Sequence, residues 1–292
     1  MSDERRSAPS PSRAAARDVR IATGGKSSHA GDAHRTSHRP RKRFGQNFLH
    51  DANVVRQIVD AVDPRPGQSI VEIGPGQAAL TGALIERAGH LHAIEIDRDL
   101  AAGLRQRFSE EELSLTQADA LTFDWSTLAT SPLRIVGNLP YNISTPLLFA
   151  LVPIAESVLD QHFMLQKEVV DRIVAAPGGK TYGRLSVMLQ FRYRLTKLFD
   201  VPRDAFRPAP QVTSSLVRMQ PLAVSELPAV DSEAFARVVA AAFNQRRKTL
   251  RNALSGLLDT EQIIESGVDP QARGETLGQQ RFVELARRLA AR

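Results

Sequence analysis

The chain has 292 residues, 42% of them hydrophobic, and a formal net charge of +6, which suffices for one large domain, a smaller one and a buried core. No run of residues approaches the roughly eighteen apolar positions of a membrane span, and no apolar signal segment opens the chain, so we expect a soluble, cytoplasmic protein without membrane contact. Cysteine is absent, which excludes disulfides and thiolate metal sites, and the 7 histidines lack the paired spacing of metal ligands, so no metal site is predicted.

The N-terminal segment holds the whole positive excess of the chain. Residues 1–43 contain 11 Lys or Arg and 4 Asp or Glu, and the rest of the chain carries a net charge of −1. Residues 1–40 also lack aromatic side chains, so we predict a disordered basic arm that cannot bury enough surface to fold. A solvated tail, an arm attracted to phosphate and a mitochondrial presequence all fit this composition, although Asp3 and Glu4 weigh against the presequence.

Strands and helices are predicted to alternate from the end of this arm to about residue 165. A helix with an apolar stripe covers Asn53–Val62 and ends at two prolines. Ser69–Ile73 is typical of a buried strand, Gly74-Pro75-Gly76 of a tight turn, and Ala79–Arg87 of the helix that follows. This alternation predicts an α/β fold with a mostly parallel sheet and helices on both faces.

The glycine turn and the next strand end predict a nucleoside-binding site. Gly74 and Gly76 allow the backbone to approach a ligand closely, and the amides of the following helix can hold its polar tail. Glu95, just after the strand over Leu91–Ile94, can accept hydrogen bonds from both ribose hydroxyls. These residues alone also fit a nicotinamide enzyme, so two cofactor classes remain open here.

Two later strands separate these cofactor classes. Leu113–Gln117 ends near Asp119, whose carboxylate can accept a hydrogen bond from a cofactor adenine amine or can cap the next helix. The apolar run Leu133–Gly137 leads directly to Asn138. A glycine turn, a ribose acid, an adenine-binding acid and this asparagine, on four successive strand ends, together describe an S-adenosylmethionine site.

The sequence Asn138-Leu139-Pro140-Tyr141 addresses one chemical problem, the methylation of an aromatic amine. The exocyclic amine of adenine is a poor nucleophile because its lone pair is delocalised into the ring. The side-chain oxygen of Asn138 and the carbonyl oxygen of Leu139 can each accept one amine hydrogen and so draw the nitrogen towards a tetrahedral shape. The ring of Tyr141 can stack on a flipped-out base. A plain strand-to-helix turn uses similar residues.

Two late strands, Lys197–Val201 and Ser214–Met219, are predicted to form an antiparallel hairpin at one edge of the sheet. The proline-rich loop between them carries Phe206. This ring can press the target base from the side opposite Tyr141, or it can pack in the core.

Residues 223–292 are predicted to form a small, all-helical domain, able to contact the phosphates of a nucleic acid, after a Rossmann-like methyltransferase domain over residues 41–222. Apolar residues at helical spacing, from Phe235 to Leu258, would pack its core. Basic residues interrupt this pattern at Arg246, Arg247, Lys248 and Arg251. Because the chain after the arm is nearly neutral, we expect any affinity for nucleic-acid phosphates to come from such local clusters, of which Arg41–Arg43 is a second. A charged turn without a partner is the alternative.

Six segments match one protein family in the same order along the chain: Lys42–Leu49, Val71–Gly76, Gly137–Ser144, Phe163–Glu168, Tyr182–Ser186 and Ala242–Thr249. With them the chain resembles the ribosomal RNA adenine dimethyltransferases, and more closely their bacterial small-subunit branch. The resemblance implies transfer of methyl groups from S-adenosylmethionine to N6 of two adjacent adenines near the 3′ end of 16S RNA, in a pre-assembled small-subunit particle. It also implies a cofactor pocket lined by Asn47, Leu49, Gly74, Glu95, Asp119 and Asn138. Many members have a further glycine at Ala78, whose methyl group we expect to crowd the turn slightly.

Two alternative functions remain open. The chain could methylate adenine in large-subunit ribosomal RNA or DNA, or it could be a non-catalytic ribosome assembly factor. The intact Asn-Leu-Pro-Tyr sequence and Glu95 favour catalysis, and Asn244–Lys248 resembles the small-subunit branch more than resistance enzymes. No heptad repeat or pairing surface is seen in the sequence, so we expect a monomer.

Overall fold

The computed structural model describes residues 46–128, 132–245 and 247–291. The predicted arm over residues 1–40, the basic segment Arg41–Arg43 and Arg246 lie outside the described residues. Within the described residues, no helix combines the length and the apolar character that crossing a membrane requires.

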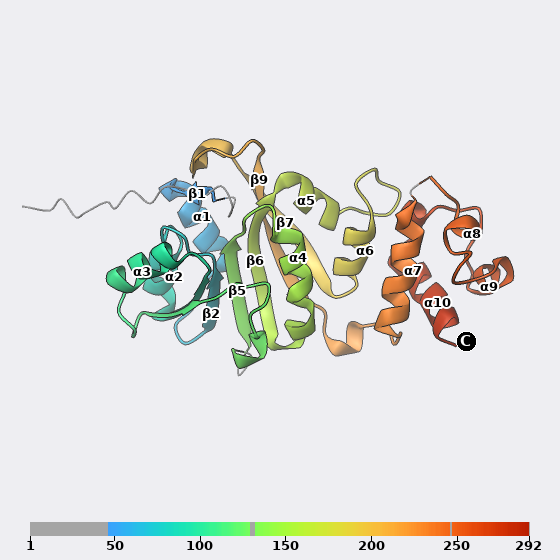
Figure 1. The fold of residues 1–292 in the computed structure, drawn as a ribbon, viewed down its shortest axis with the longest axis horizontal. Coiled ribbons are helices and arrows are strands. Elements are labelled where there is room, and N and C mark those ends of the chain that lie inside the picture. Colours follow the sequence, from blue (N-terminus) through green and yellow to red (C-terminus); the bar gives the residue numbers. More distant parts are fainter. Residues whose placement is uncertain (1–45, 129–131, 246, 292) are drawn as a thin grey trace, which may run out of the picture. The chain divides into compact units, whose positions relative to one another are not determined.

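A seven-stranded sheet of order β4-β3-β2-β5-β6-β9-β7 forms the centre of the described chain (Figure 1). The strands from β4 to β6 in this order pair in parallel, β9 is antiparallel to β6, and β7 is antiparallel to β9. The mostly parallel sheet and the antiparallel pair at its edge are thus confirmed. The strands are β2 (Ser69–Ile73), β3 (Leu91–Glu95), β4 (Leu113–Gln117), β5 (Leu133–Asn138), β6 (Val158–Gln166), β7 (Tyr193–Val201) and β9 (Ser214–Pro221).

Helices cover both faces of this sheet, as predicted (Figure 1). Apolar side chains of α1 (Ala52–Val62), α2 (Thr81–Ala88) and α3 (Arg98–Arg107) share one buried cluster with Ile70 and Met164 of the sheet. Side chains on the other face of the sheet pack against α4 (Ser144–Ala150), α5 (Lys167–Ile173) and α6 (Arg184–Gln190). Short 3₁₀ turns complete the connections: η2 (Trp125–Thr127), η3 (Val152–Ser157), η4 (Arg203–Ala205) and η5 (Val224–Glu226).

A separate two-stranded ladder lies at the start of the described chain. Strand β1 (Phe48–Leu49) pairs antiparallel with β8 (Phe206–Arg207), so that Leu49 faces Phe206 in the register. The His50 amide extends the contact by donating to the Ala205 carbonyl oxygen at 2.9 Å. The ladder therefore ties the chain before α1 to the loop between β7 and β9.

The C-terminal helices have a buried cluster of their own. They are α7 (Ser232–Asn244), α8 (Leu250–Ala253), α9 (Thr260–Glu265) and α10 (Gln279–Ala290), with the turn η6 (Gly274–Thr276). Their core includes Tyr182 and Val187 from the segment around α6, and the Tyr182 hydroxyl donates to the Leu277 carbonyl oxygen at 3.0 Å. The predicted helical C-terminal part is observed, while the domain boundary near residue 222 stays a prediction.

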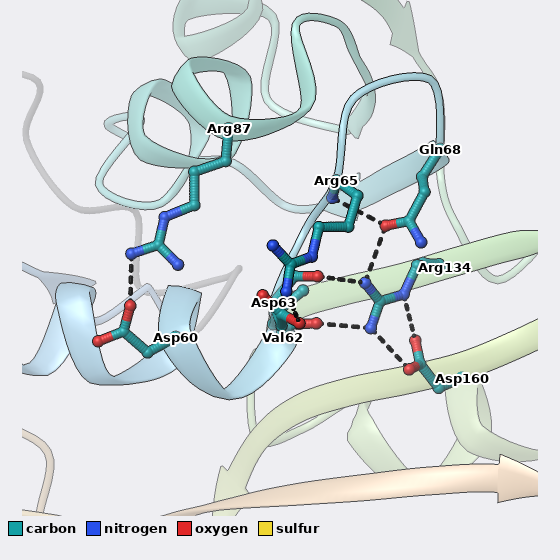
Figure 2. A network of polar contacts seen from close by, with 8 residues as sticks. All are labelled: Asp60, Val62, Asp63, Arg65, Gln68, Arg87, Arg134 and Asp160. Atoms are coloured by element: carbon teal, nitrogen blue, oxygen red, sulfur yellow. Dashed lines mark hydrogen bonds and ion pairs between the residues drawn. The ribbon is translucent and has the colours of Figure 1, made fainter.

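Arg134, at the start of β5, joins the sheet to the end of α1 (Figure 2). Its guanidinium donates to both carboxylate oxygens of Asp160, at 2.9 and 2.7 Å. It also donates to the carbonyl oxygens of Val62 and Asp63, which have no partner within the helix because α1 ends there. A buried cation thus satisfies the C-terminus of the helix and pairs with a buried anion.

Candidate cofactor and nucleobase site

A pocket opens at the carboxyl ends of β2, β3, β4 and β5. Strand β2 lies between β3 and β5, so the order of the strands reverses there. Ligands bind outside the strand ends at such reversal points in open parallel sheets. The pocket brings together all the residues predicted to bind the cofactor or perform catalysis: Asn47, Leu49, Gly74, Gly76, Glu95, Asp119, Asn138, Leu139 and Tyr141.

The turn after β2 needs glycine for two different reasons. Gly74 and Gly76 have φ angles of +66° and +56°, in the left-handed region that side chains disfavour. A Cβ atom on Gly76 would also lie 3.2 Å from the ring of Phe48. Ala78 adopts φ +64° as well, while its methyl group is buried in the core. The positive φ of Ala78 is unfavourable for the backbone by roughly 1–2 kcal/mol, and slight crowding by its methyl group remains a prediction.

Glu95 connects the glycine turn to the end of β3. Its carboxylate, only 4% exposed, accepts from the Gly76 amide at 3.1 Å and from the Asp97 amide at 2.8 Å. Burial raises the pKa of Glu95, and these two hydrogen bonds act in the opposite direction. The Ile96 amide contributes a further hydrogen bond that acts in the same direction. A carboxylate has about four acceptor positions, so Glu95 can still accept from a ribose hydroxyl in the pocket.

The sequence analysis missed a second buried acid in the same pocket. Glu72 of β2 is 2% exposed and accepts from the Thr81 hydroxyl at 2.7 Å. Burial is the main reason that the pKa of Glu72 rises to about 7, and the negative charge of Glu95 adds to the shift. A signal was available, since an acid within an otherwise apolar strand is rarely buried without a role.

Asp119 lines the pocket and also caps the turn after β4. One of its carboxylate oxygens accepts from the Leu121 amide at 2.9 Å, which agrees with the capping interpretation. Among the described residues, no hydrogen bond reaches the other carboxylate oxygen of Asp119, and its hydrogen bond to a cofactor adenine remains a prediction.

Asn138 and Leu139 are held by backbone contacts at the end of β5. The side-chain nitrogen of Asn138 donates to the Asn47 carbonyl oxygen at 3.0 Å, so the carboxamide oxygen is the atom left for a ligand. The Leu139 amide donates to the Met164 carbonyl oxygen at 3.2 Å. Among the described residues, no donor reaches the carbonyl oxygen of Leu139. The two acceptors required for an adenine amine are thus both available.

Tyr141 is half-buried at the pocket and is anchored by a residue that the sequence analysis also missed. Its hydroxyl lies 2.7 Å from the Oγ atom of Ser214, the first residue of β9, whose side chain is fully buried. Burial raises the pKa of Tyr141, so the phenol stays protonated at neutral pH.

The comparison with known proteins decides the family. Residues 37–291 match the family model described as ribosomal RNA adenine dimethylase. The chain belongs to this family. A ribosomal RNA small subunit methyltransferase A from Aromatoleum aromaticum is 58% identical over 257 residues, which cover 88% of this chain and 97% of that protein.

Two solved structures share the fold of this dimethylase. A dimethyladenosine transferase from Plasmodium falciparum has a TM-score of 0.69 at 23% identity, with 82% of this chain and 95% of that one covered. The 23S rRNA methyltransferase ErmE has a TM-score of 0.64 at 24% identity, with 84% and 100% covered. At these identities the likeness concerns the fold, which confirms the predicted Rossmann-like methyltransferase sheet.

The dimethylase uses S-adenosylmethionine, which supplies a methyl group activated by a positively charged sulfur. The pocket fits this cofactor: a Cβ atom on Gly74 would meet no atom within 4 Å, so a ligand can approach the backbone there, and the buried Glu95 retains acceptor capacity for its ribose. Among the described residues, no group of three or more acidic or histidine side chains is arranged to hold a metal ion.

One site prediction for the dimethylase needs correction. Phe206 is 2% exposed and packs in the cluster that contains Leu49, Met164 and Leu216, and it does not line the pocket. Its pairing with β1 turns the ring into the core. Of the two interpretations of Phe206, the structure therefore supports core packing and not stacking on a base opposite Tyr141.

The basic residues of the dimethylase form a surface separate from the pocket. Arg247, Lys248 and Arg251 are exposed at the turn between α7 and α8, and none of them lines the pocket. No hydrogen bond or ion pair engages these three side chains within the described part of the chain. They are thus available to a ligand, and their contact with RNA remains a prediction.

Proposed function

We propose that this enzyme dimethylates N6 of two adjacent adenines near the 3′ end of 16S RNA, acting as a cytoplasmic monomer on a pre-assembled small-subunit particle. The observation that carries the proposal is the fixed carboxamide of Asn138. Its nitrogen is engaged by the Asn47 carbonyl oxygen, so its oxygen is the atom left as an acceptor at the pocket. The Asn138 carboxamide oxygen and the Leu139 carbonyl oxygen are two acceptors, which suit an amine that has two hydrogens to donate.

The proposed chemistry rests on positioning and on polarisation of the amine. The Asn138 carboxamide oxygen and the Leu139 carbonyl oxygen each accept one hydrogen of N6, which localises the nitrogen lone pair. Tyr141 supports the flipped-out base by stacking. The N6 lone pair forms the new bond to the methyl carbon, the bond from that carbon to sulfur breaks with its electrons on sulfur, and an amine proton passes to water. No ionised base is required from the protein.

Binding of the particle is assigned to basic surfaces outside the pocket. The exposed side chains of Arg247, Lys248 and Arg251 can contact backbone phosphates, which position an RNA without reading its bases. We propose that Arg246 and Arg41–Arg43, which lie beside this turn and beside the pocket segment in the sequence, add to the same attraction.

The alternatives differ from this proposal in substrate or in catalysis. The relative at 58% identity is named as a small-subunit methyltransferase, which favours the small subunit, whereas ErmE shares only the fold. The pocket residues are assembled and both acceptors at Asn138 and Leu139 are available, which supports catalysis over a purely structural assembly role.

The experiment that tests the proposal compares substrates in parallel. Purified enzyme is given S-adenosylmethionine with a tritiated methyl group, and isolated small subunits, isolated large subunits, free 16S RNA and duplex DNA. We expect label on small subunits above all, and mass mapping should place it on two adjacent adenines as dimethyl groups. Label on large subunits alone, or none on any substrate, would overturn the proposal.

A further inference from the structure

We infer that Ser214 is a positioning residue whose hydrogen bond to Tyr141 serves mainly the second methyl transfer to each adenine. The inference rests on the proposed function and concerns a residue outside the pocket lining. Ser214 begins β9, faces Gln166 of β6 in the register, and is fully buried. Its Oγ atom lies 2.7 Å from the Tyr141 hydroxyl.

The hydrogen bond between Ser214 and Tyr141 holds the ring of Tyr141, whereas Asn138 and Leu139 are held by backbone carbonyl oxygens. Asn138 and Leu139 are fixed through the carbonyl oxygens of Asn47 and Met164. The Tyr141 ring is only half-buried, and Ser214 provides the sole polar partner of its hydroxyl among the described residues. A ring that is held at its far end keeps one tilt, which is what a stacking surface requires.

The two methyl transfers place different demands on this ring. In the first transfer, N6 has two hydrogens and meets two acceptors, the Asn138 carboxamide oxygen and the Leu139 carbonyl oxygen. In the second transfer, N6 has one hydrogen, so one acceptor loses its partner and the hydrogen bonds constrain the base less. Stacking on Tyr141 then carries a larger share of the alignment. The remaining lone pair forms the second bond to a methyl carbon, its bond to sulfur breaks, and the last N6 proton passes to water.

Two variants remove the contact from either side. Ser214→Ala removes the anchor, and Tyr141→Phe keeps the stacking ring but removes the hydroxyl that reaches Ser214. In each we expect the first transfer to slow less than about threefold and the second to slow about tenfold, which corresponds to roughly 1.4 kcal/mol. Monomethyladenine should therefore accumulate on small subunits, where single-turnover reactions and mass spectrometry of digested RNA resolve it from dimethyladenine.

The double variant and a neighbouring serine make the test specific. Because both changes break the same hydrogen bond, Ser214→Ala combined with Tyr141→Phe should be no slower than either alone. Ser215→Ala is the matched control, since this serine is equally buried but donates to Asp200 at 2.5 Å. It should leave the ratio of monomethyl to dimethyl product unchanged.

The possible failures are distinguishable. If wild-type enzyme does not methylate small subunits, the proposed function fails. If wild-type enzyme does, but both single variants give the normal product ratio, or their effects on the second transfer add in the double variant, the role of Ser214 is overturned. Should Ser214→Ala not fold, Tyr141→Phe alone decides, because a normal ratio there would show that the hydrogen bond is not used.

Discussion

The side-chain nitrogen of Asn138 donates to the backbone carbonyl oxygen of Asn47 across 91 positions of sequence. This bond fixes which end of the carboxamide faces the pocket, because the nitrogen is already engaged. The same segment, through Phe48, lies against the turn at Gly76. The chain before α1 thus contacts both the glycine turn after β2 and the asparagine at the end of β5.

Replacing Asn138 tests whether this orientation matters for catalysis. Asn138→Ala removes an acceptor used in the transition state, and we expect a loss of about 3 kcal/mol, or roughly a hundredfold in rate. Asn138→Asp keeps the size, but its carboxylate cannot donate to the Asn47 carbonyl oxygen and is repelled by it, so it should not rescue the rate. Single-turnover methylation of small subunits measures the rate, and calorimetry should show cofactor affinity less affected. An unchanged rate in Asn138→Ala would remove this residue from the chemistry.

The basic turn between α7 and α8 should determine how binding depends on salt. Each lysine or arginine that neutralises a phosphate contributes about 0.7–0.9 to the slope of log affinity against log salt concentration. Replacing Arg247, Lys248 and Arg251 together by alanine should therefore reduce the slope by roughly 2. Filter binding of small subunits at several potassium concentrations measures it.

The matched control for this turn is Arg288→Ala on α10. Arg288 also lies in the C-terminal helices, but it pairs with Glu265 and is not part of the basic turn. Its replacement should leave the slope unchanged. Equal slopes for the wild type and the triple variant would show that this surface does not meet phosphate.

Local patterns predicted most of the sheet and the residues that line the pocket, but none of the hydrogen bonds between distant segments of the site. The strands Ser69–Ile73 and Leu113–Gln117 were predicted with the bounds that the structure has, because each is a short run between turn residues. β7 begins at Tyr193, four positions before the predicted start, and its first residues pair with Gln220 and Pro221 at the end of β9. This segment is a strand because it pairs with β9, and its own sequence does not indicate that partner.

The side chains whose roles were missed depend on partners distant in sequence. Ser214 and Tyr141 are separated by 73 positions, and nothing near either residue indicates the other. Phe206 has a loop-like context of prolines, yet its register opposite Leu49 places it in the core. The two acceptors at Asn138 and Leu139 could be predicted from the sequence, because both residues belong to the same short motif.

The buried ion pair at the start of β5 should contribute strongly to stability. Arg134→Ala leaves Asp160 without its partner and the last carbonyl oxygens of α1 without a donor, so we expect a loss of about 3–5 kcal/mol. Arg65→Ala is a control of the same residue type, because its pair with Asp63 is exposed, with side chains 68% and 56% accessible (Figure 2). It should change stability by less than about 1 kcal/mol.

Urea denaturation at neutral pH measures both of these variants. Replacing the pair by Arg134→Met with Asp160→Leu should recover part of the loss, since no buried charge remains. Recovery should be incomplete because the carbonyl oxygens of Val62 and Asp63 still lack a donor. A loss in Arg134→Ala no larger than in Arg65→Ala would contradict this account of the network.

Glu72 should make the cofactor-free protein less stable as pH rises. Its pKa is about 7 in the folded chain against 4.5 ordinarily, because burial disfavours the charged carboxylate. Between these values the folded state keeps a proton that the unfolded state has released, so stability falls as pH increases through this window. Above pH 7 the full penalty applies, at roughly 3 kcal/mol.

Glu72→Gln isolates this contribution, because the neutral amide can still accept from the Thr81 hydroxyl but does not titrate. We expect the variant to match the wild type near pH 4.5 and to exceed it by up to roughly 3 kcal/mol at pH 8. Thr81→Val should act in the opposite direction, since losing the hydroxyl removes the hydrogen bond that lowers the pKa of Glu72. Urea titrations of the cofactor-free proteins from pH 4.5 to 8 measure the difference. Parallel curves for wild type and Glu72→Gln would show that this carboxylate ionises normally, and its place in the pocket would then need another explanation.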